Sequence, residues 1–253
     1  MTLYKLSWMI FLLLANHSVL AQETYFKHQS LVNTEQTPSI VSSSHVATDS
    51  FIGCIDYKIT YSGVNALDEE AQSKIAFLIE NNTENLGVNK SYCFNEFGDK
   101  LEINYNANVA DKTWYFADTN EEYTLFKSGI MKFGVNNVAE PEGFEGLAIK
   151  KLEVLGPQKE IMGYQTNQVL LVRESGIKTE FWVSDKLLRH PLSYQNNKFG
   201  YADEIYDAIK GVHLYQRKVI GDLFIIEEEA TAIHAGSPDK ELFILPNVDL
   251  YHW

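Results

Sequence analysis

The feature that most constrains the fold is a run of eleven residues, 51–61, in which apolar or aromatic residues occupy every second position. A period of two matches the alternation of side chains along a β-strand. The run therefore predicts a long strand with one buried face. The residues on that face are Phe51, Gly53, Ile55, Tyr57, Ile59 and Tyr61.

Further strand-length segments follow at short intervals. They cover residues 91–96, 100–105, 113–117, 121–126, 149–155, 164–173, 178–184, 212–219, 223–233 and 241–245. Connections this short indicate that neighbouring strands pair antiparallel, because parallel strands need a long crossover. Phe97-Gly98-Asp99 predicts a tight turn between two of them.

Helical spacing replaces the period of two in residues 65–81, where Ala71, Ile75 and Leu78 fall on one side. Asn65 is the predicted N-cap of this helix. Weaker helical signals cover residues 186–190 and residues 202–209, and the second is predicted to end at Gly211. Residues 51–253 are therefore expected to form one α+β domain, a long antiparallel sheet covered by one or two helices.

The N-terminal residues have the pattern of an export signal. Residues 1–21 contain Lys5, an apolar stretch over residues 6–14 and a small-residue end at Ala21, as in a secretory signal peptide. Residues 22–50 are polar and rich in Ser and Thr, which predicts a flexible leader. Gln22 follows the predicted cleavage site, so no lipid-anchor cysteine is expected there. No later stretch is apolar enough to span a bilayer, so we expect a soluble, exported protein.

The chain carries 21 Lys and Arg against 34 Asp and Glu, a net charge of −13. This balance argues against nucleic acid as a partner, because phosphates attract cations and repel carboxylates. The two cysteines, Cys54 and Cys93, lie in predicted strands of an exported chain, where disulfides persist. They are a candidate disulfide, and the alternative is two separate buried thiols.

Seven short motifs, taken in order behind a signal peptide, resemble a family of exported envelope proteins from Gram-negative bacteria. That family's architecture is similar to the LolA/LppX lipoprotein-carrier superfamily, and the resemblance covers about residues 51–250. The motifs are Phe51-x-Gly53-x-Ile55-x-Tyr57, Gly163-Tyr164, Thr179-Glu180-Phe181-Trp182-Val183-Ser184-Asp185, Pro191, Gly211-Val212-His213-Leu214, Ala230-Thr231-Ala232-Ile233 and Phe243-Ile244-Leu245-Pro246.

The resemblance implies an incomplete antiparallel β-barrel, open on one side, with helices in its mouth and an apolar cavity between them. Carriers of that superfamily hold acyl chains in this cavity and transport them across the periplasm. Aromatic and aliphatic residues of the predicted strands could line such a cavity, or they could form an ordinary core. The cavity candidates are Ile55, Tyr57, Tyr61, Trp114, Phe116, Tyr123 and Trp182. The helix at 65–81 would be either a movable lid or a fixed cover.

No catalytic signature is present. The histidines show no pair at i, i+4 spacing, and Ser175 lacks the glycine pattern of a nucleophile elbow. Asp118-x-Asn120-x-Glu122 starts like a calcium loop, but the glycine and the final glutamate are missing. We therefore predict no metal, no cofactor and no enzymatic activity. Glu228, if it faces the interior, needs a partner such as Arg217 or Lys218.

These observations predict a soluble periplasmic or secreted protein. It would bind an apolar or lipid-like ligand in an open β half-barrel, with a role in envelope lipid or lipoprotein handling. The alternative is a non-enzymatic protein–protein interaction module of the envelope, with a solid core and another envelope protein as its partner.

Overall fold

The computed structural model describes residues 49–64, 68–126, 129–135, 139–140, 146–221, 223–248 and 250–252. The predicted signal peptide, residues 1–21, lies outside the described residues, and so does the predicted leader except for Asp49 and Ser50. Ser50 already contacts the folded part, because it forms an isolated β-bridge with Leu188. The described chain therefore joins the sheet one residue before the predicted start of the domain.

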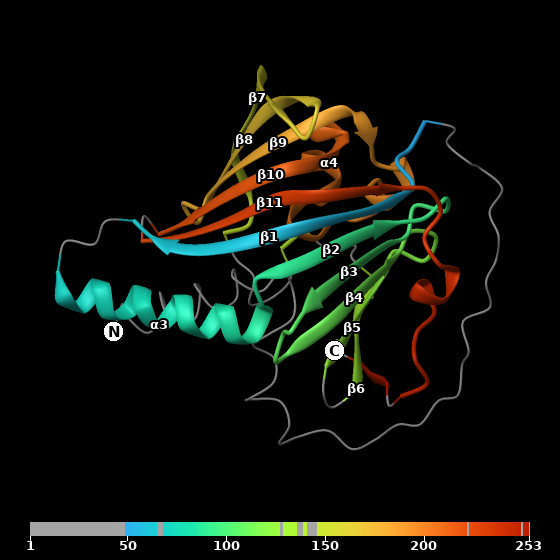
Figure 1. Cartoon of the computed structure of the whole chain (residues 1–253), viewed down its shortest axis with the longest axis horizontal. Helices are drawn as coiled ribbons and strands as arrows, with labels where there is room; N and C mark the ends of the chain where they lie inside the picture. The colour runs from blue at the N-terminus through green and yellow to red at the C-terminus, as the bar shows by residue number, and fades with distance from the viewer. Residues whose placement is uncertain are drawn as a thin grey trace. The chain divides into compact units, whose positions relative to one another are not determined.

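The described residues form one sheet of twelve strands in the order β12-β6-β5-β4-β3-β2-β1-β11-β10-β9-β8-β7 (Figure 1). Strands β1 to β11 pair antiparallel, and β12 pairs parallel with β6. The order is linear, so the sheet is open and β7 and β12 are its edges. The bounds of the twelve strands are β1 Gly53–Gly63, β2 Asn89–Phe94, β3 Lys100–Tyr105, β4 Ala110–Phe116, β5 Glu121–Phe126, β6 Gly129–Val135, β7 Ile149–Ile161, β8 Tyr164–Arg173, β9 Lys178–Leu188, β10 Gly211–Ile220, β11 Phe224–Ala235 and β12 Leu250–His252. The predicted antiparallel sheet is confirmed.

Two α-helices lie within the described residues, α3 (Glu69–Leu86) and α4 (Ala202–Ile209). The first begins later than predicted, because Oδ1 of Asp68 accepts the Ala71 N–H at 2.7 Å and makes Asp68 the N-cap; the predicted cap, Asn65, lies outside the described residues. It also continues past residue 81 and ends at Gly87, whose φ of 75° favours glycine.

Two predicted elements were wrong. Residues 186–188 continue β9, and no helix forms at 186–190. Residues 241–245 are not a strand, because Lys240–Phe243 forms the 3₁₀ helix η3, capped where Asp239 accepts the Glu241 N–H at 3.0 Å. Two further 3₁₀ turns, η1 (Pro191–Ser193) and η2 (Phe199–Tyr201), lie between β9 and α4.

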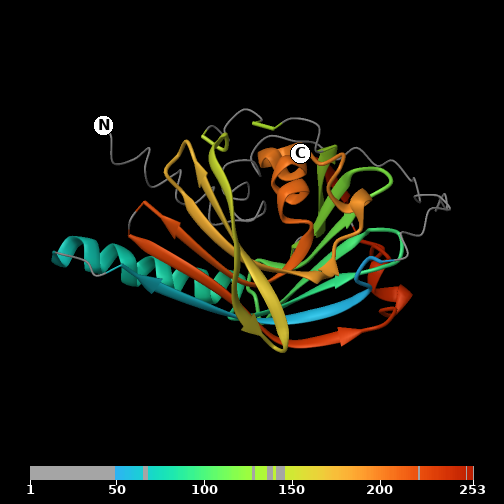
Figure 2. The ribbon, with the colours of Figure 1, turned by 90° about the horizontal axis from the view of Figure 1, so that it is seen from above.

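The sheet is curved, and α4 lies on its concave side (Figure 2). Helix α3 instead lies beside the end of β1 and extends away from the sheet (Figures 1 and 2). Its buried residues are Ile75, Leu78 and Asn82. A Cβ at Gly63 would come within 2.5 Å of Ile75, so this glycine lets helix and strand approach closely. The α-helix that lies on the concave face is therefore α4, whereas the helix expected at 65–81 to act as a movable lid or a fixed cover lies beside the end of β1.

Candidate functional site

A single excursion of the chain, residues 189–210, covers part of the concave face, and we call it the cover segment. It leaves the sheet after β9 and returns to it at β10. Its two ends meet, because the Arg189 N–H donates to the Lys210 carbonyl at 2.8 Å. Ile205 and Ile209 of α4 are buried on the sheet. The sheet residues in the same apolar cluster are Val169, Leu171, Phe181 and Val183.

Local sequence explains how the cover segment folds. Pro191 stands at the start of η1, where its fixed φ suits the turn, and Nδ1 of His190 accepts the Leu192 N–H at 3.2 Å. Helix α4 has Asp203 and Glu204 in its first turn, where the helix dipole favours carboxylates. It ends at Lys210, which has a φ of 56°, and Gly211 is already the first residue of β10.

Beside the contact between α4 and the sheet, the concave face carries another apolar cluster, which combines residues of β1, β2, β9, β10 and β11. Ile55 and Tyr57 are buried in it, and the Tyr57 hydroxyl donates to the His213 carbonyl at 2.5 Å. Burial raises the pKa of Tyr57 well above its ordinary value, so the phenol stays protonated and can donate. The other buried members are Phe51, Tyr92, Phe94, Leu187, Val212, Leu214 and Ala230.

A row of ionisable side chains, most of them buried, crosses the same face, and we call it the charge row. It consists of Lys100, Glu102, Lys90, Glu228 and His213. The Lys90 ammonium lies 2.8 Å from Oε1 of Glu228 and 3.5 Å from Oε1 of Glu102. Oε2 of Glu102 lies 3.7 Å from the Lys100 ammonium, and Oε2 of Glu228 lies 3.3 Å from Nε2 of His213. Each carboxylate therefore lies between two basic side chains.

Burial and pairing act in opposite directions on the charge row. Burial favours the neutral form of Glu228, yet the Lys90 ammonium and the His213 ring hold the pKa of Glu228 well below its ordinary value. Burial likewise favours neutral Lys90, but Glu102 and Glu228 raise the pKa of Lys90. Burial lowers the pKa of His213. Lys90, Glu102 and Glu228 are thus charged at neutral pH, and His213 is neutral.

Arg189, the first residue of the cover segment, lies where the charged and apolar parts of the face meet. Its guanidinium carbon is 4.0 Å from the centre of the Tyr206 ring on α4 and 5.8 Å from that of Phe94 on β2. Desolvation would raise the pKa of Tyr206, but Arg189 and two lysines, Lys100 and Lys218, lower it. The electrostatic potential around Tyr206, near the base of the cover segment, is therefore positive.

The seven predicted cavity residues do not lie together. Ile55 and Tyr57 belong to the concave face, as does Tyr61, whose hydroxyl donates to the Gly87 carbonyl at 3.0 Å. Four others lie on the convex face, because their register places them in line with Cys54 and Lys58. These four are Trp114, Phe116, Tyr123 and Trp182.

The convex residues have their own cover. Trp114 and Tyr123 pack with Cys93 and Leu101, and the segment around η3 lies against them. The indole N–H of Trp114 donates to the Leu242 carbonyl at 2.8 Å, which holds that segment in place. Trp182 lies apart from this cluster. The centre of its ring is 4.9 Å from that of the Tyr215 ring, in an edge-to-face contact. The convex aromatics thus pack against the protein's own chain.

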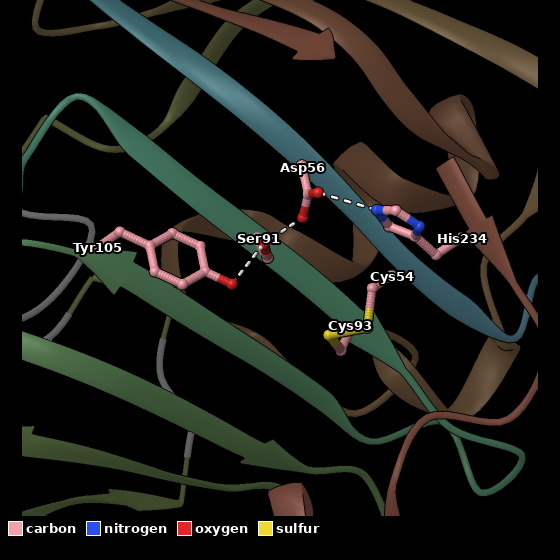
Figure 3. Close-up of a disulfide and its surroundings, with 6 residues drawn as sticks. All are labelled: Cys54, Asp56, Ser91, Cys93, Tyr105 and His234. Atoms are coloured by element: carbon pink, nitrogen blue, oxygen red, sulfur yellow. Dashed lines mark hydrogen bonds and ion pairs between the residues drawn. A yellow bond between two sulfur atoms is a disulfide. The ribbon is translucent and has the colours of Figure 1, made fainter. Parts of the chain in front are cut away.

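Cys54 and Cys93 form a disulfide on this face (Figure 3). The two residues are direct partners in the register of β1 with β2, and their Cα atoms are 4.0 Å apart. The bond therefore joins adjacent strands at facing positions. The alternative of two separate thiols does not apply to this structure.

Figure 3 also shows Asp56 between Ser91 and His234. The Ser91 hydroxyl donates to Oδ1 of Asp56, and Oδ2 of Asp56 lies 2.9 Å from Nε2 of His234. A serine nucleophile needs an imidazole on its own hydroxyl, whereas here the carboxylate occupies that position. Ser91 is also only 2% exposed. This cluster is not arranged for nucleophilic catalysis.

The described residues contain no group of three or more His, Cys, Asp or Glu that could hold a metal ion. Among them, no helix combines the length and the hydropathy needed to cross a membrane. Neither a protein-family model nor a curated protein matches the sequence.

Sequence reasoning missed Lys90 and Arg189. Of the two partners it named for Glu228, Lys218 does interact with this carboxylate, because Glu228 opposes the lowering of the Lys218 pKa by burial, whereas Arg217 pairs elsewhere. Arg217 lies 3.7 Å from Glu227, and Glu228 pairs with Lys90 and His213. A signal for Lys90 existed, because it has the same phase as Tyr92 and Phe94, but the predicted strand began one residue after it. For Arg189, at the end of a strand, the sequence held no comparable signal.

Proposed function

We propose that this protein binds an apolar or lipid-like ligand on the concave face of its open sheet, beneath the cover segment. The observation that carries the proposal is the cover segment itself. It is one excursion, closed at its base, whose helix places Ile205 and Ile209 on an apolar sheet face. A ligand that displaced these two side chains would meet the residues they now contact.

Apolar burial by itself favours such an exchange. Lifting Ile205 and Ile209 from the sheet would cost roughly 3–6 kcal/mol of lost burial. An acyl chain that buries about fourteen CH₂ groups would gain roughly 11 kcal/mol on the same scale. The cover segment could therefore open for a long acyl chain, and closing lids of this kind are common in binding proteins.

The open antiparallel sheet with a helix on its concave side also supports the likeness to the LolA/LppX carriers. On that basis the protein acts in the periplasm, after removal of residues 1–21, in envelope lipid or lipoprotein handling. It uses no cofactor and has no enzymatic role.

A second candidate function is docking of another envelope protein. The observation that favours it is the edge strand β7, where Val154 is 55% exposed and Leu155 is 42% exposed. Edge strands with exposed apolar residues can pair with another chain.

Native mass spectrometry of the protein purified from its own envelope fraction tests the proposal. We expect the mass of a chain that begins at Gln22, with a lipid or other apolar molecule at about one per chain. The bare protein should also take up one added oleate. A bare polypeptide mass without any uptake of oleate would overturn the binding proposal and favour docking.

A control variant separates binding beneath the cover from adsorption to the surface. Phe77 on α3 is 56% exposed, away from the cover segment. Phe77→Ser should keep the uptake of oleate. Loss of uptake in this variant would place the bound oleate on α3 and contradict the proposed site.

A further inference from the structure

Arg189 is a buried cation for which the described residues provide no carboxylate. The residue is 7% exposed, and its Nε atom has no hydrogen-bond partner. Its guanidinium contacts are with two aromatic rings, Tyr206 and Phe94, and with the Tyr206 hydroxyl. An arginine stays protonated in a protein, and a buried charge without a counter-ion is costly.

The nearby carboxylates do not supply the missing charge. Glu102 lies between Lys90 and Lys100, and Glu228 lies between Lys90 and His213. Burial raises the pKa of Glu122, another carboxyl on this face, to about 7, so it is only partly ionised at neutral pH. Arg189 thus adds a positive charge to a row that is already balanced. In a protein with a net charge of −13, this is a local excess of the opposite sign.

We propose that Arg189 binds the carboxylate head group of a long-chain fatty acid, with its acyl chain on the concave face. This inference rests on the proposed function and names the ligand class. A planar guanidinium matches a carboxylate in shape and can donate two parallel hydrogen bonds to it. A carboxylate carries one negative charge, which matches the single positive charge of Arg189. A phosphate monoester carries about −1.5 to −2 and would leave an excess of negative charge.

The position of Arg189 fits an amphiphile. Phe94, whose ring lies beside the guanidinium, is also 6.1 Å from the ring of Phe51, and both belong to the apolar cluster of the concave face. Tyr206 on the other side of Arg189 belongs to the cover segment and packs against the second apolar cluster. A head group at Arg189 would therefore start between two apolar surfaces, and its chain could continue along either.

The test compares two ligands that differ in the head group. Dissociation constants for oleate and for uncharged oleyl alcohol are measured by isothermal titration calorimetry with the mature chain. The wild type should bind oleate at least about 10-fold more tightly, the effect of a charge-assisted hydrogen bond. Equal affinities would overturn the inference while leaving the proposed function intact. If neither ligand binds, both fail.

Variants then assign the preference to Arg189. Arg189→Gln should weaken oleate binding about 10- to 100-fold and leave oleyl alcohol binding within about 2-fold. Arg189→Lys keeps the charge and should retain part of the preference. Arg217→Gln is the matched control, because this half-buried arginine pairs with Glu227 on the convex face, and it should leave both affinities unchanged.

A purely structural Arg189 predicts another result. Arg189→Gln would then lower the melting temperature, yet the ratio of the two affinities would equal that of the wild type, which overturns the inference. Circular dichroism establishes that each variant is folded. If Arg189→Gln does not fold, Arg189→Lys and the preference of the wild type still decide the question.

Discussion

The Lys90 ammonium on β2 and the Glu228 carboxylate on β11 lie 2.8 Å apart, although 138 positions separate them in the sequence. Strand β1 lies between the two strands, so the pair spans it on the concave face. Both side chains are almost completely buried. A buried pair of this kind offers weak net stabilisation, but removing one partner leaves the other charge without compensation.

Lys90→Met is therefore expected to destabilise the fold by about 3–5 kcal/mol, because it leaves Glu228 and Glu102 buried without their shared cation. Adding Glu228→Gln to Lys90→Met should recover part of the loss, since one of the two stranded charges is then removed. Urea unfolding at pH 7, followed by tryptophan fluorescence, measures the free energies of both variants.

The exposed pair of Lys74 and Glu70 on α3 is the matched control, with 2.5 Å between its charged atoms. Lys74→Met should cost about 0.5 kcal/mol or less, as expected of an i, i+4 surface pair. If Lys90→Met costs no more than Lys74→Met, the buried row does not contribute as the structure indicates.

Glu122 is expected to make the protein less stable as the pH rises. Burial raises the pKa of Glu122 from 4.5 to about 7. Between these values the folded state holds a proton that the unfolded state has lost, so the unfolding free energy falls with increasing pH. Over the whole interval the loss is about 3 kcal/mol. Glu122→Gln should remove this loss.

The measurement is urea unfolding of wild type and Glu122→Gln from pH 4 to pH 8. The difference between the two curves should be smallest near pH 4 and should grow in favour of the variant up to about pH 7. Glu80→Gln, at an exposed position of α3, should give a curve parallel to that of the wild type. A constant difference between Glu122→Gln and wild type would contradict the buried, protonated carboxyl.

Much of the sheet could be predicted because alternation along a strand is a local property. The segments 100–105, 121–126 and 164–173 coincide with β3, β5 and β8. The segment 241–245 misled for a physical reason. Leu242, Phe243 and Leu245 pack on the convex cluster, although they lie in or just after the 3₁₀ helix η3. Their side chains are apolar because they contact this cluster, and not because the segment pairs with a strand. Strand β6, which carries glycines at 129 and 134, was not predicted.

The candidate site could be predicted only in part. Alternation shows that Ile55 and Tyr57 share a face, and that Trp114 and Phe116 do. It does not show whether those two faces are the same, because that depends on the register through β2 and β3. Trp114 falls in line with Cys93 and Cys54, and so on the convex side. The relation of Arg189 to Tyr206 depends on tertiary packing, which a local pattern does not contain.

The Cys54–Cys93 disulfide should contribute strongly to stability. It closes a loop with a sequence separation of 39, for which the chain-entropy relation gives about 4 kcal/mol. The double variant Cys54→Ala with Cys93→Ala should therefore unfold at a clearly lower urea concentration than the oxidised wild type. In the presence of a reductant, the urea midpoints of the double variant and the wild type should become similar. An unchanged midpoint for the double variant without reductant would contradict this contribution.

The base of the cover segment provides two neighbouring substitutions with opposite expected effects. Gly211 approaches another strand closely, since a Cβ there would lie 2.3 Å from the Ser184 carbonyl oxygen. Gly211→Ala should cost about 1–3 kcal/mol, because backbone must move to accommodate the methyl group. Lys210 is exposed and has a φ of 56°. Lys210→Gly should stabilise by about 0.5–1 kcal/mol, the relief of a left-handed residue less the added entropy of the unfolded chain.

Hydrogen exchange connects these two variants to the cover segment. The Lys210 carbonyl accepts the Arg189 N–H and so closes the base of that segment. Gly211→Ala displaces this base and should speed the exchange of amides in residues 189–210 more than that of amides in β1. Lys210→Gly should slow it or leave it unchanged. If Gly211→Ala speeds exchange equally in both places, the cover segment opens only when the whole sheet unfolds, and a ligand could not enter beneath it from the folded state.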